Sequence, residues 1–324
     1  MIVVISHLQD PHAVRVLEAL ASRGADTFLF DLADLPATAT LSVDYRVPAS
    51  PRARIAHATA GPIDLSHATA VWWRRPQFVG LDAITDADAR GFAHGEWHEA
   101  LYGLWELLAC PWMNQPVRDE VASRKALQLA VASRLGLRVP DTLLTSDADE
   151  ARAFIGRHGV GRTIYKIFSA THQVWRETRL VKPDDLAMLD GLHLAPVIFQ
   201  EFVPAVADLR ITVVGDDIFP MAIDSRGTGY EVDFRVSLAT AATSVWDLPD
   251  HVADALRRLM AHFGLAYGAV DLRVTEDGEY VFLEINTAGE FLFAEHRCGL
   301  PITDAVAGWL AEPPAAHRRP VAPY

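Results

Sequence analysis

The sequence predicts an α/β (α+β) fold that opens with a parallel sheet and carries an antiparallel hairpin near its end. Residues 2–6 form a buried strand pattern, a helix begins at Pro11 and ends at Gly24, and 26–32 returns as a strand. A strand, a helix and a second strand in this order imply a parallel pair. Residues 268–293 contain two alternating strands around an Asp-Gly pair, which is a strong hairpin signal.

Composition places the chain among ordinary globular proteins. It has 324 residues, of which 50% are apolar and 22% are charged, enough for two or three domains. The net charge of −13 argues against non-specific nucleic-acid binding, which needs a basic face. The two cysteines lack metal-ligand spacing, and there is no signal peptide and no apolar run near the ~20 residues of a membrane span. We therefore expect a reduced, soluble, cytoplasmic protein without membrane partners.

After short strand signals in 36–66, the next feature is the strand pattern of Val71 to Trp73, which ends in Arg74 and Arg75. Arginines at the end of a strand can bind phosphate or carboxylate, or they can form a solvated rim. Spacing alone favours the rim. A long helix is then expected over 86–108, and its tryptophans indicate core or subunit interface rather than a ligand site.

The middle of the chain alternates helices and strands. A helix is expected over 119–135 with Lys125 on its polar side, followed by strands at 142–145 and 163–168. Lys166 interrupts the second of these strands, and it either extends to solvent or stands above a pocket floor. Residues 169–179 are polar and read as a loop. Strands then follow within 196–224, a helix covers 250–263, and the tail from 313 is expected to be disordered.

The terminal hairpin brings two acids together. If Asp277 and Gly278 form a two-residue turn, Asp271 faces Glu284, Arg273 faces Phe282 and Thr275 faces Tyr280. Opposed carboxylates lie roughly 5 Å apart and repel each other. A divalent cation resolves this conflict, and Asn286 adds a neutral oxygen ligand, a set that suits Mg²⁺. The alternative is an exposed polar face on which Arg273 neutralises the acids.

In this order and spacing, the residues resemble the ATP-grasp superfamily, and within it the ligases that make graspetides, the microviridin-type ω-ester and ω-amide peptides. The segments that carry the resemblance are Asp10-Pro11-His12, 71–76, Lys125 with Gly136-Leu137, Tyr165-Lys166, 200–203, 208–210, 233–235, Asp271 and 284–286. Glutamate ligases of the ribosomal-protein S6 type share the second half but differ in the N-terminal part.

The resemblance implies an ATP-grasp fold with four parts. They are an N-terminal parallel α/β pre-ATP-grasp domain at 1–115, a central subdomain with the lid and leader-binding side at 116–195, a C-terminal subdomain with the Mg-nucleotide site at 196–312, and a flexible tail at 313–324.

The resemblance also implies roles for individual residues. Lys125 and Lys166 would bind the ATP phosphates, and Asp271, Glu284 and Asn286 would hold Mg²⁺. The backbone of Glu201, Phe202 and Val203 would read adenine, Leu283 or Phe282 would pack on the purine, and Asp208 would contact ribose or substrate. Arg210 and Arg235 would stabilise the acyl phosphate and the tetrahedral intermediate. Candidate substrate contacts are Arg74, Arg75, Ser169, Thr171 and Glu290.

The implied function is an ATP-dependent carboxylate ligase that closes side-chain ester or amide rings in a ribosomally made precursor peptide, with a leader and a core, through an acyl phosphate. The implied assembly is a homodimer. An amino-acid or protein-tail ligase of the glutamate-ligase type is the first alternative, and a non-catalytic nucleotide-binding protein is the second. The family continues after the metal-binding Asn as Pro-Asn-Gly-Gln-Trp, whereas this chain reads Thr-Ala-Gly-Glu-Phe at 287–291. This departure concerns substrate recognition rather than ATP chemistry.

Overall fold

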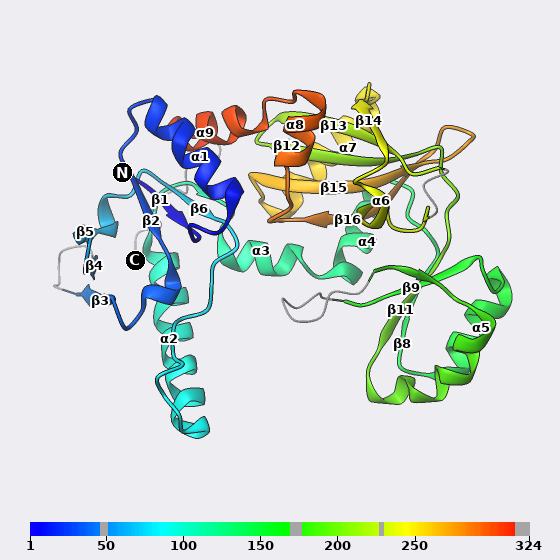
Figure 1. The fold of residues 1–324 in the computed structure, drawn as a ribbon, viewed down its shortest axis with the longest axis horizontal. Coiled ribbons are helices and arrows are strands. Elements are labelled where there is room, and N and C mark those ends of the chain that lie inside the picture. Colours follow the sequence, from blue (N-terminus) through cyan, green and yellow to red (C-terminus); the bar gives the residue numbers. More distant parts are fainter. Residues whose placement is uncertain (46–50, 169–176, 227–229, 315–324) are drawn as a thin grey trace.

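The computed structural model describes residues 1–45, 51–168, 177–226 and 230–314. Its N-terminal lobe is built on a parallel sheet in the order β2-β1-β6-β7 (Figure 1). These strands are β1 (Ile2–Ile5), β2 (Thr27–Phe30), β6 (Ala70–Trp73) and β7 (Trp112–Met113). Helix α1 (Pro11–Ser22) joins β1 to β2, and the two strands pair in parallel, so the predicted unit is confirmed.

Two additions extend this lobe. The weak strand signals form an antiparallel sheet of β3 (Ala39–Asp44), β4 (Arg52–His57) and β5 (Gly61–Asp64), flanked by the short helices η1 (Leu32–Asp34) and η2 (Leu65–His67). Helix α2 (Ala87–Leu107) follows and projects away from the lobe (Figure 1). Its C-terminal part is buried through Leu101, Leu104 and Trp105, as expected of core positions.

A larger antiparallel sheet, in the order β14-β13-β12-β15-β16, occupies the second half of the chain. Its strands are β12 (Ala207–Val214), β13 (Asp217–Asp224), β14 (Ala242–Val245), β15 (Tyr267–Val274) and β16 (Tyr280–Asn286). Apolar side chains such as Ile211 and Leu272 pack against helix α7 (Asp250–Phe263). Because side chains alternate along a strand, polar residues of β12 and β15 are left on the opposite face.

The single helix predicted over 119–135 is wrong. The structure has two helices, α3 (Pro116–Ala122) and α4 (Lys125–Arg134), so Lys125 begins a helix instead of lying within one. At the break, the buried amide of Gln128 donates a 2.7 Å hydrogen bond to the carbonyl of Ala122, the last residue of α3, and so satisfies a carbonyl that the end of a helix leaves unpaired.

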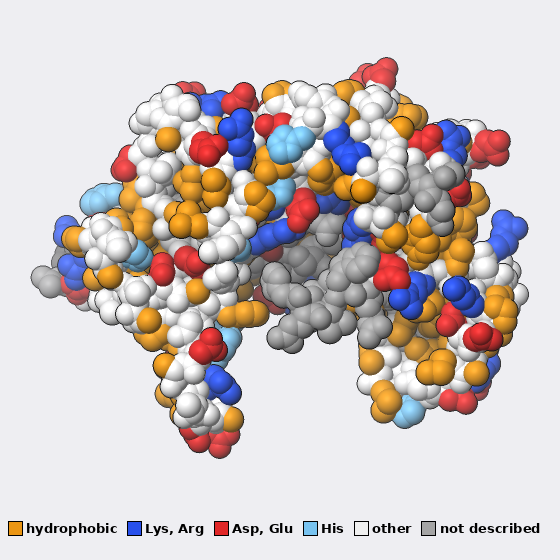
Figure 2. Space-filling view, in the orientation of Figure 1, with side chains coloured by type: hydrophobic (Ala, Val, Ile, Leu, Met, Phe, Trp, Pro, Cys, Tyr) orange, Lys and Arg blue, Asp and Glu red, His pale blue; other side chains and the backbone are white. Residues whose placement is uncertain are grey.

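A third sheet, in the order β10-β9-β11-β8, forms a small separate lobe (Figure 1). It contains β8 (Thr142–Thr145), β9 (Thr163–Lys166), β10 (Arg179–Leu180) and β11 (Val197–Glu201). Helices α5 (Ala148–His158) and η3 (Pro183–Leu194) pack against it through a cluster that includes Phe154 and Phe199. The surface is hollowed between this lobe and the N-terminal lobe (Figure 2).

This sheet suggests different domain limits from those expected. An end of the central subdomain at residue 195 would separate β11 from the strands with which it pairs. Helices α3 and α4, expected in the central subdomain, contribute Ala122, Val131 and Ala132 to the core of the large sheet. We therefore propose that the small lobe comprises about 140–201 and that α3 and α4 belong with the large sheet.

The chain ends by returning to the N-terminal lobe. After the short helices α6 (Phe234–Ser237) and α8 (Leu292–Cys298), helix α9 (Ile302–Ala311) packs beside α1, where Val306 and Leu310 share a core with Val16 and Leu20. No helix in the described ranges is both long and apolar enough to cross a membrane. The expected flexible tail lies, from residue 315 onward, outside the described residues.

Candidate active site

The predicted pairing of Asp271 with Glu284 is confirmed, but the hairpin reaches it differently. The turn is a three-residue loop, because the Thr275 N–H donates to the Glu279 carbonyl at 3.0 Å. Gly278 has a φ of 82° there, a left-handed conformation that favours glycine. Arg273 therefore faces Val281, so the predicted pairings of Arg273 with Phe282 and Thr275 with Tyr280 are wrong.

A bulge in β16 restores the expected register at the acids. Leu272 pairs with Phe282 and Asp271 pairs with Glu284, which leaves Leu283 as an extra residue in β16. The bulge changes which side chains face the core: Phe282 is fully buried beneath the sheet, whereas Leu283 is partly exposed. Of the two residues expected near the purine, Leu283 is the one with an accessible side chain.

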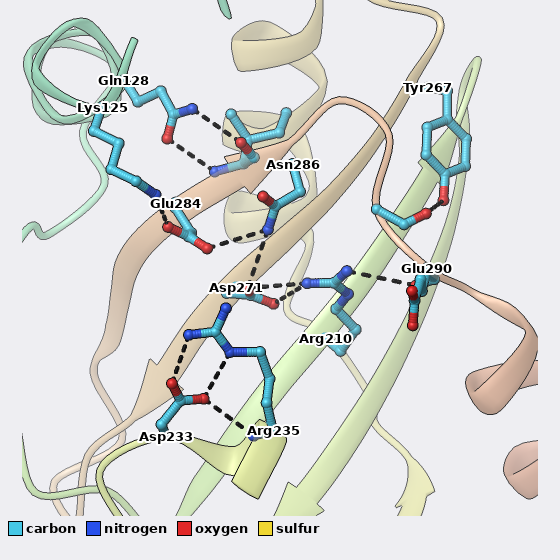
Figure 3. A network of polar contacts seen from close by, with 12 residues as sticks. Lys125, Gln128, Arg210, Asp233, Arg235, Tyr267, Asp271, Glu284, Asn286 and Glu290 are labelled. Atoms are coloured by element: carbon cyan, nitrogen blue, oxygen red, sulfur yellow. Dashed lines mark hydrogen bonds and ion pairs between the residues drawn. The ribbon is translucent and has the colours of Figure 1, made fainter. Parts of the chain in front are cut away.

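Cations neutralise both acids (Figure 3). Asp271 is 6% exposed, and both of its oxygens accept from Nη1 of Arg210, at 2.9 and 3.0 Å. Lys125, from the first turn of α4, forms an ion pair with Glu284. The amide of Asn286 lies between the acids, 3.2 Å from Glu284 and 3.5 Å from Asp271. The alternative in which Arg273 neutralises the acids is wrong, because Arg273 pairs with Asp208 instead.

These contacts set the protonation of the site. Burial alone raises the pKa of Glu284, but Lys125 and Lys166 outweigh it and hold this pKa well below its ordinary value. Burial raises the pKa of Asp271, and Arg210 opposes that rise. Burial also lowers the pKa of Lys166 to about 8, despite the opposing effect of Glu284. The site therefore holds charges that are expensive to bury without partners.

The donor set fits Mg²⁺. Asp271, Glu284 and Asn286 place oxygen-bearing side chains together, and Mg²⁺ prefers carboxylate and other oxygen ligands. The Asn286 amide is oriented with its nitrogen toward the acids, and a rotation about its last bond would present its oxygen instead. Lys125 and Arg210 already supply the positive charge that the paired acids require.

Gln128 positions Lys125 and Glu284 relative to each other, and the sequence did not predict this role. Its amide donates to the Ile285 carbonyl at 2.9 Å and accepts from the Ile285 N–H at 3.1 Å, so that it joins α4 to β16 (Figure 3). This fixes Lys125 relative to Glu284, which neighbours Ile285. A buried glutamine among apolar helix positions was the available signal, because a buried amide needs partners.

The segment from Glu201 to Val203, whose backbone is expected to read adenine, connects the small lobe to the large sheet, and we call it the hinge. The Phe202 N–H donates to the Arg162 carbonyl at 2.8 Å, and the Glu201 N–H donates to the Asp141 carbonyl at 2.9 Å. The Val203 carbonyl accepts a 2.7 Å hydrogen bond from Arg273, whose guanidinium lies 5.2 Å from the centre of the Phe202 ring.

Arg273 also accounts for Asp208. The side chain of Asp208 is buried and accepts from Nε of Arg273 at 2.8 Å and from the Ser225 hydroxyl at 2.7 Å. These contacts give each of its oxygens one hydrogen-bond donor, and the expected contact with ribose or substrate stays a prediction. Asp208 orients Arg273, and Arg273 in turn braces the hinge. The sequence predicted the sheet face of Arg273 but not its partner.

Arg235 lies below Asp271 on the polar face (Figure 3). It follows Asp233, which caps α6 and pairs with Arg235 at 2.7 and 2.5 Å. These bonds raise the pKa of Arg235 above its ordinary value, so its charge is permanent. The polar face thus presents Arg210 and Arg235 near the paired acids. Lys166, at the end of β9, approaches them from the small lobe.

Of the remaining candidates, Arg74 is not the solvated rim that spacing favours. Its side chain is fully buried and pairs with Asp10 at 3.0 Å. Arg75 is exposed and pairs with Glu290 at 2.9 Å. Ser169 and Thr171 lie outside the described residues.

This arrangement defines the class of the molecule, which is an ADP-forming ATP-grasp ligase with the α/β fold expected from the resemblance. Residues 1–120 match the MvdD pre-ATP grasp domain and residues 122–310 match the RimK-like ATP-grasp domain. Because the second match spans more than half of this chain, the chain belongs to the RimK-like ATP-grasp family.

Solved structures extend the similarity to the whole molecule. The macrocyclase MdnC from Microcystis aeruginosa MRC, bound with precursor peptide MdnA, is 30% identical with a TM-score of 0.85, over 96% of this chain and 99% of that one. The ATP-grasp ligase PsnB, complexed with minimal precursor, Mg and ADP, is 26% identical with a TM-score of 0.79, over 96% of both chains. A ribosomal protein bS6–L-glutamate ligase of Escherichia coli is 26% identical over 64% of this chain and 69% of its own length.

Proposed function

We propose that this protein is an ATP- and Mg²⁺-dependent ligase that closes side-chain ester or amide rings in a ribosomally synthesised precursor peptide. The observation that carries the proposal is the combination, in one chain, of the complete charged set around Asp271 and Glu284 with an N-terminal domain of the MvdD type. The leader and the core of the precursor are its proposed partners, and MdnC and PsnB were both solved with precursor peptides.

The chemistry follows from the charges. A side-chain carboxylate of the peptide attacks the γ-phosphorus of ATP, ADP leaves, and an acyl phosphate forms. Lys125 and Lys166 hold the phosphates, while Arg210 and Arg235 face the charge that develops on the acyl group. Bound Mg²⁺, held by Asp271, Glu284 and Asn286, would neutralise charge on the phosphates. A hydroxyl or amine then attacks the acyl carbon, gives up a proton and displaces phosphate. Positioning and electrostatics carry such reactions.

The adenine contacts belong to the same proposal. The backbone of Glu201 to Val203 reads adenine beside the accessible Leu283, and Arg273 holds that backbone in place. Substrate contacts are proposed for Arg75 and Glu290, which are partly exposed next to the polar face. Ser169 and Thr171 remain substrate candidates from the sequence.

Two alternatives predict different products. A glutamate ligase acting on an amino acid or a protein tail is suggested by the bS6-ligase relative, but that likeness spans 64% of this chain. A nucleotide-binding protein without catalysis is disfavoured because Lys125, Asp271 and Glu284 are all present and paired.

We also propose that the protein is a homodimer. Helix α2 offers exposed apolar surface for such an interface at Phe92, which is 72% exposed. Light scattering would measure the mass of the assembly.

The test uses a short peptide that is encoded beside the gene for this protein and that contains Thr, Ser or Lys together with Glu or Asp. With ATP and Mg²⁺, ADP release should accompany the loss of one water mass per ring. The Asp271→Asn variant should give neither product, since it removes the charge of one proposed metal ligand. ADP release with free amino acids but not with the peptide would favour the glutamate-ligase alternative. Tight ATP binding with no ADP from any acceptor would favour the non-catalytic one.

A further inference from the structure

The segment 287–291, which we call the acceptor loop, departs from the family pattern and follows directly after Asn286. Residues of the N-terminal half hold its backbone. The Thr287 carbonyl accepts from Asn114 at 3.3 Å, and the Phe291 N–H donates to His12 at 3.5 Å. Between these ends, the N-terminal lobe contacts the backbone of the segment through Arg74 and Arg75.

Arg74 makes the strongest of these contacts. Its Nη1 donates to the carbonyls of Ala288 and Gly289, at 2.7 and 2.8 Å, while its Nε donates to Asp10 at 3.0 Å. The Gly289 carbonyl also accepts from the Tyr267 hydroxyl at 2.7 Å. Hydrogen bonds from a buried guanidinium are short and strong because the donor is charged. Arg74 therefore ties the end of β6 to the middle of the acceptor loop.

On its other side, the acceptor loop meets Arg210. The Glu290 carbonyl accepts from Nη2 of Arg210 at 3.5 Å, and Arg210 lies between Asp271 and Glu290 (Figure 3). The backbone at Gly289 is so close that an added Cβ would lie 2.8 Å from Nη2 of Arg210 and 2.4 Å from the Cβ of Ala269. Only glycine fits there without displacing a neighbour. A shift of the acceptor loop would therefore be felt by Arg210.

We propose that Arg74 is a positioning residue for the second step of the reaction. Acting through the Ala288 and Gly289 carbonyls, it fixes the acceptor loop against Arg210 and so sets where the hydroxyl or amine meets the acyl phosphate. This role rests on the proposed function. Arg74 donates to Asp10, Ala288 and Gly289 rather than to Lys125, Glu284 or Asn286, so we assign its effect to the second step.

The consequence of losing this contact is uncoupling. With the acceptor loop displaced, ATP still phosphorylates the peptide carboxylate, but water attacks the acyl phosphate in place of the acceptor. That path returns the carboxylate and releases phosphate, so ADP forms without a new bond. The ratio of ADP to new bonds does not depend on how much enzyme is folded, and a merely structural role for Arg74 would leave it unchanged.

Two variants test the proposal. Arg74→Lys keeps a positive charge for Asp10 but loses the planar fork that serves two carbonyls as well. Gly289→Ala leaves Arg74 intact and displaces the acceptor loop from Arg210 by the added Cβ. Both should raise the ratio of ADP to new bonds by about tenfold, the effect of losing a charged hydrogen bond, with nucleotide affinity within about twofold of wild type. Arg23→Lys, at the exposed pair with Asp304, is the matched control and should leave the ratio unchanged.

The outcomes separate this role from the proposed function. A raised ratio in both variants supports positioning by Arg74, and a raised ratio in Gly289→Ala alone supports it if Arg74→Lys yields no folded protein. Wild-type ratios in the folded variants, with activity falling only in step with the folded fraction, would overturn it. A wild-type enzyme that forms no bond in any peptide would overturn the proposed function, and this role with it.

Discussion

Residues 284–286 and the acceptor loop, 287–291, are adjacent in sequence but are held in place by different parts of the molecule. Glu284 and Asn286 are fixed by the neighbouring strand β15 and by α4, which packs on the large sheet. The acceptor loop is held by Arg74 and Asn114, which follow strands β6 and β7 of the N-terminal lobe, as well as by Tyr267 and Arg210 of the large sheet. The metal-binding residues are thus held by the large sheet and α4, whereas the acceptor loop depends on the N-terminal lobe as well.

The largest effect should come from removing a proposed metal ligand. We expect Asp271→Ala to lower the rate of ADP release by at least about a thousandfold, because it removes a proposed metal ligand and leaves Arg210 buried without its partner. Initial rates with saturating ATP measure the effect, and circular dichroism verifies the fold. Activity near wild type in a folded variant would refute the metal assignment.

Lys166 tests the phosphate contact from the small lobe. We expect Lys166→Ala to weaken ADP binding by about tenfold or more, since a charged hydrogen bond to phosphate is lost. Calorimetric titration in the presence of Mg²⁺ measures the affinity. Arg152→Ala, on the surface of the same lobe and paired with Asp149 and Asp190, is the control and should bind as wild type does. An unchanged affinity in Lys166→Ala would exclude the phosphate role.

A substitution of Gln128 tests whether α4 holds the metal-binding strand β16 in place. Gln128→Leu removes hydrogen bonds to Ile285 and Ala122 and leaves buried backbone groups unpaired. The free energy of unfolding should fall by about 2–4 kcal/mol, measured by urea denaturation. Ser133→Ala, on the exposed side of α4, should change it by less than about 0.5 kcal/mol. Equal values for both variants would show that Gln128 is not a structural link.

The pKa of Lys166 gives a smaller effect with a definite sign. Because burial lowers this pKa to about 8, we expect about half of the Lys166 side chains to be neutral at pH 8 in the absence of nucleotide. Phosphate favours the charged form, so ADP binding at pH 8 should take up about half a proton, and less as the pH falls. Calorimetry in two buffers of different ionisation enthalpy measures this uptake. Identical uptake in Lys166→Ala would assign it to another group.

A substitution of Arg75 should have the smallest effect on stability, in contrast to one of the buried Arg74. Its pair with Glu290 is partly exposed, so Arg75→Ala should change the free energy of unfolding by less than about 1 kcal/mol. Thermal or urea denaturation measures the change. A loss as large as that of a buried ion pair would mean that the acceptor loop depends on Arg75 as much as on Arg74.

The sequence predicts local patterns well. The first parallel unit, the alternation along β15 and the pairing of Asp271 with Glu284 all follow from residues close together in the chain. The hairpin details do not follow, because a three-residue loop and the bulge at Leu283 shift the register in opposite directions and cancel at the acids. A two-residue turn gives the same pairing of Asp271 for a different reason.

Long-range partners could not be predicted in the same way. Arg74 reads as a strand end beside a proline, and only the folded chain brings it to carbonyls more than 200 residues away. Gln128 reads as one residue in a continuous helix, although its amide joins the end of α3 to β16. Such contacts depend on the packing of lobes, which local propensity does not encode.

An isotope-transfer experiment tests the central claim, ligation through an acyl phosphate, most directly. A peptide whose carboxylates carry ¹⁸O would be incubated with ATP, Mg²⁺ and the enzyme, and the released phosphate analysed by mass spectrometry. The proposed chemistry predicts one ¹⁸O in phosphate for each bond formed, because the attacking carboxylate oxygen leaves with the γ-phosphoryl group. Bond formation with unlabelled phosphate would contradict it.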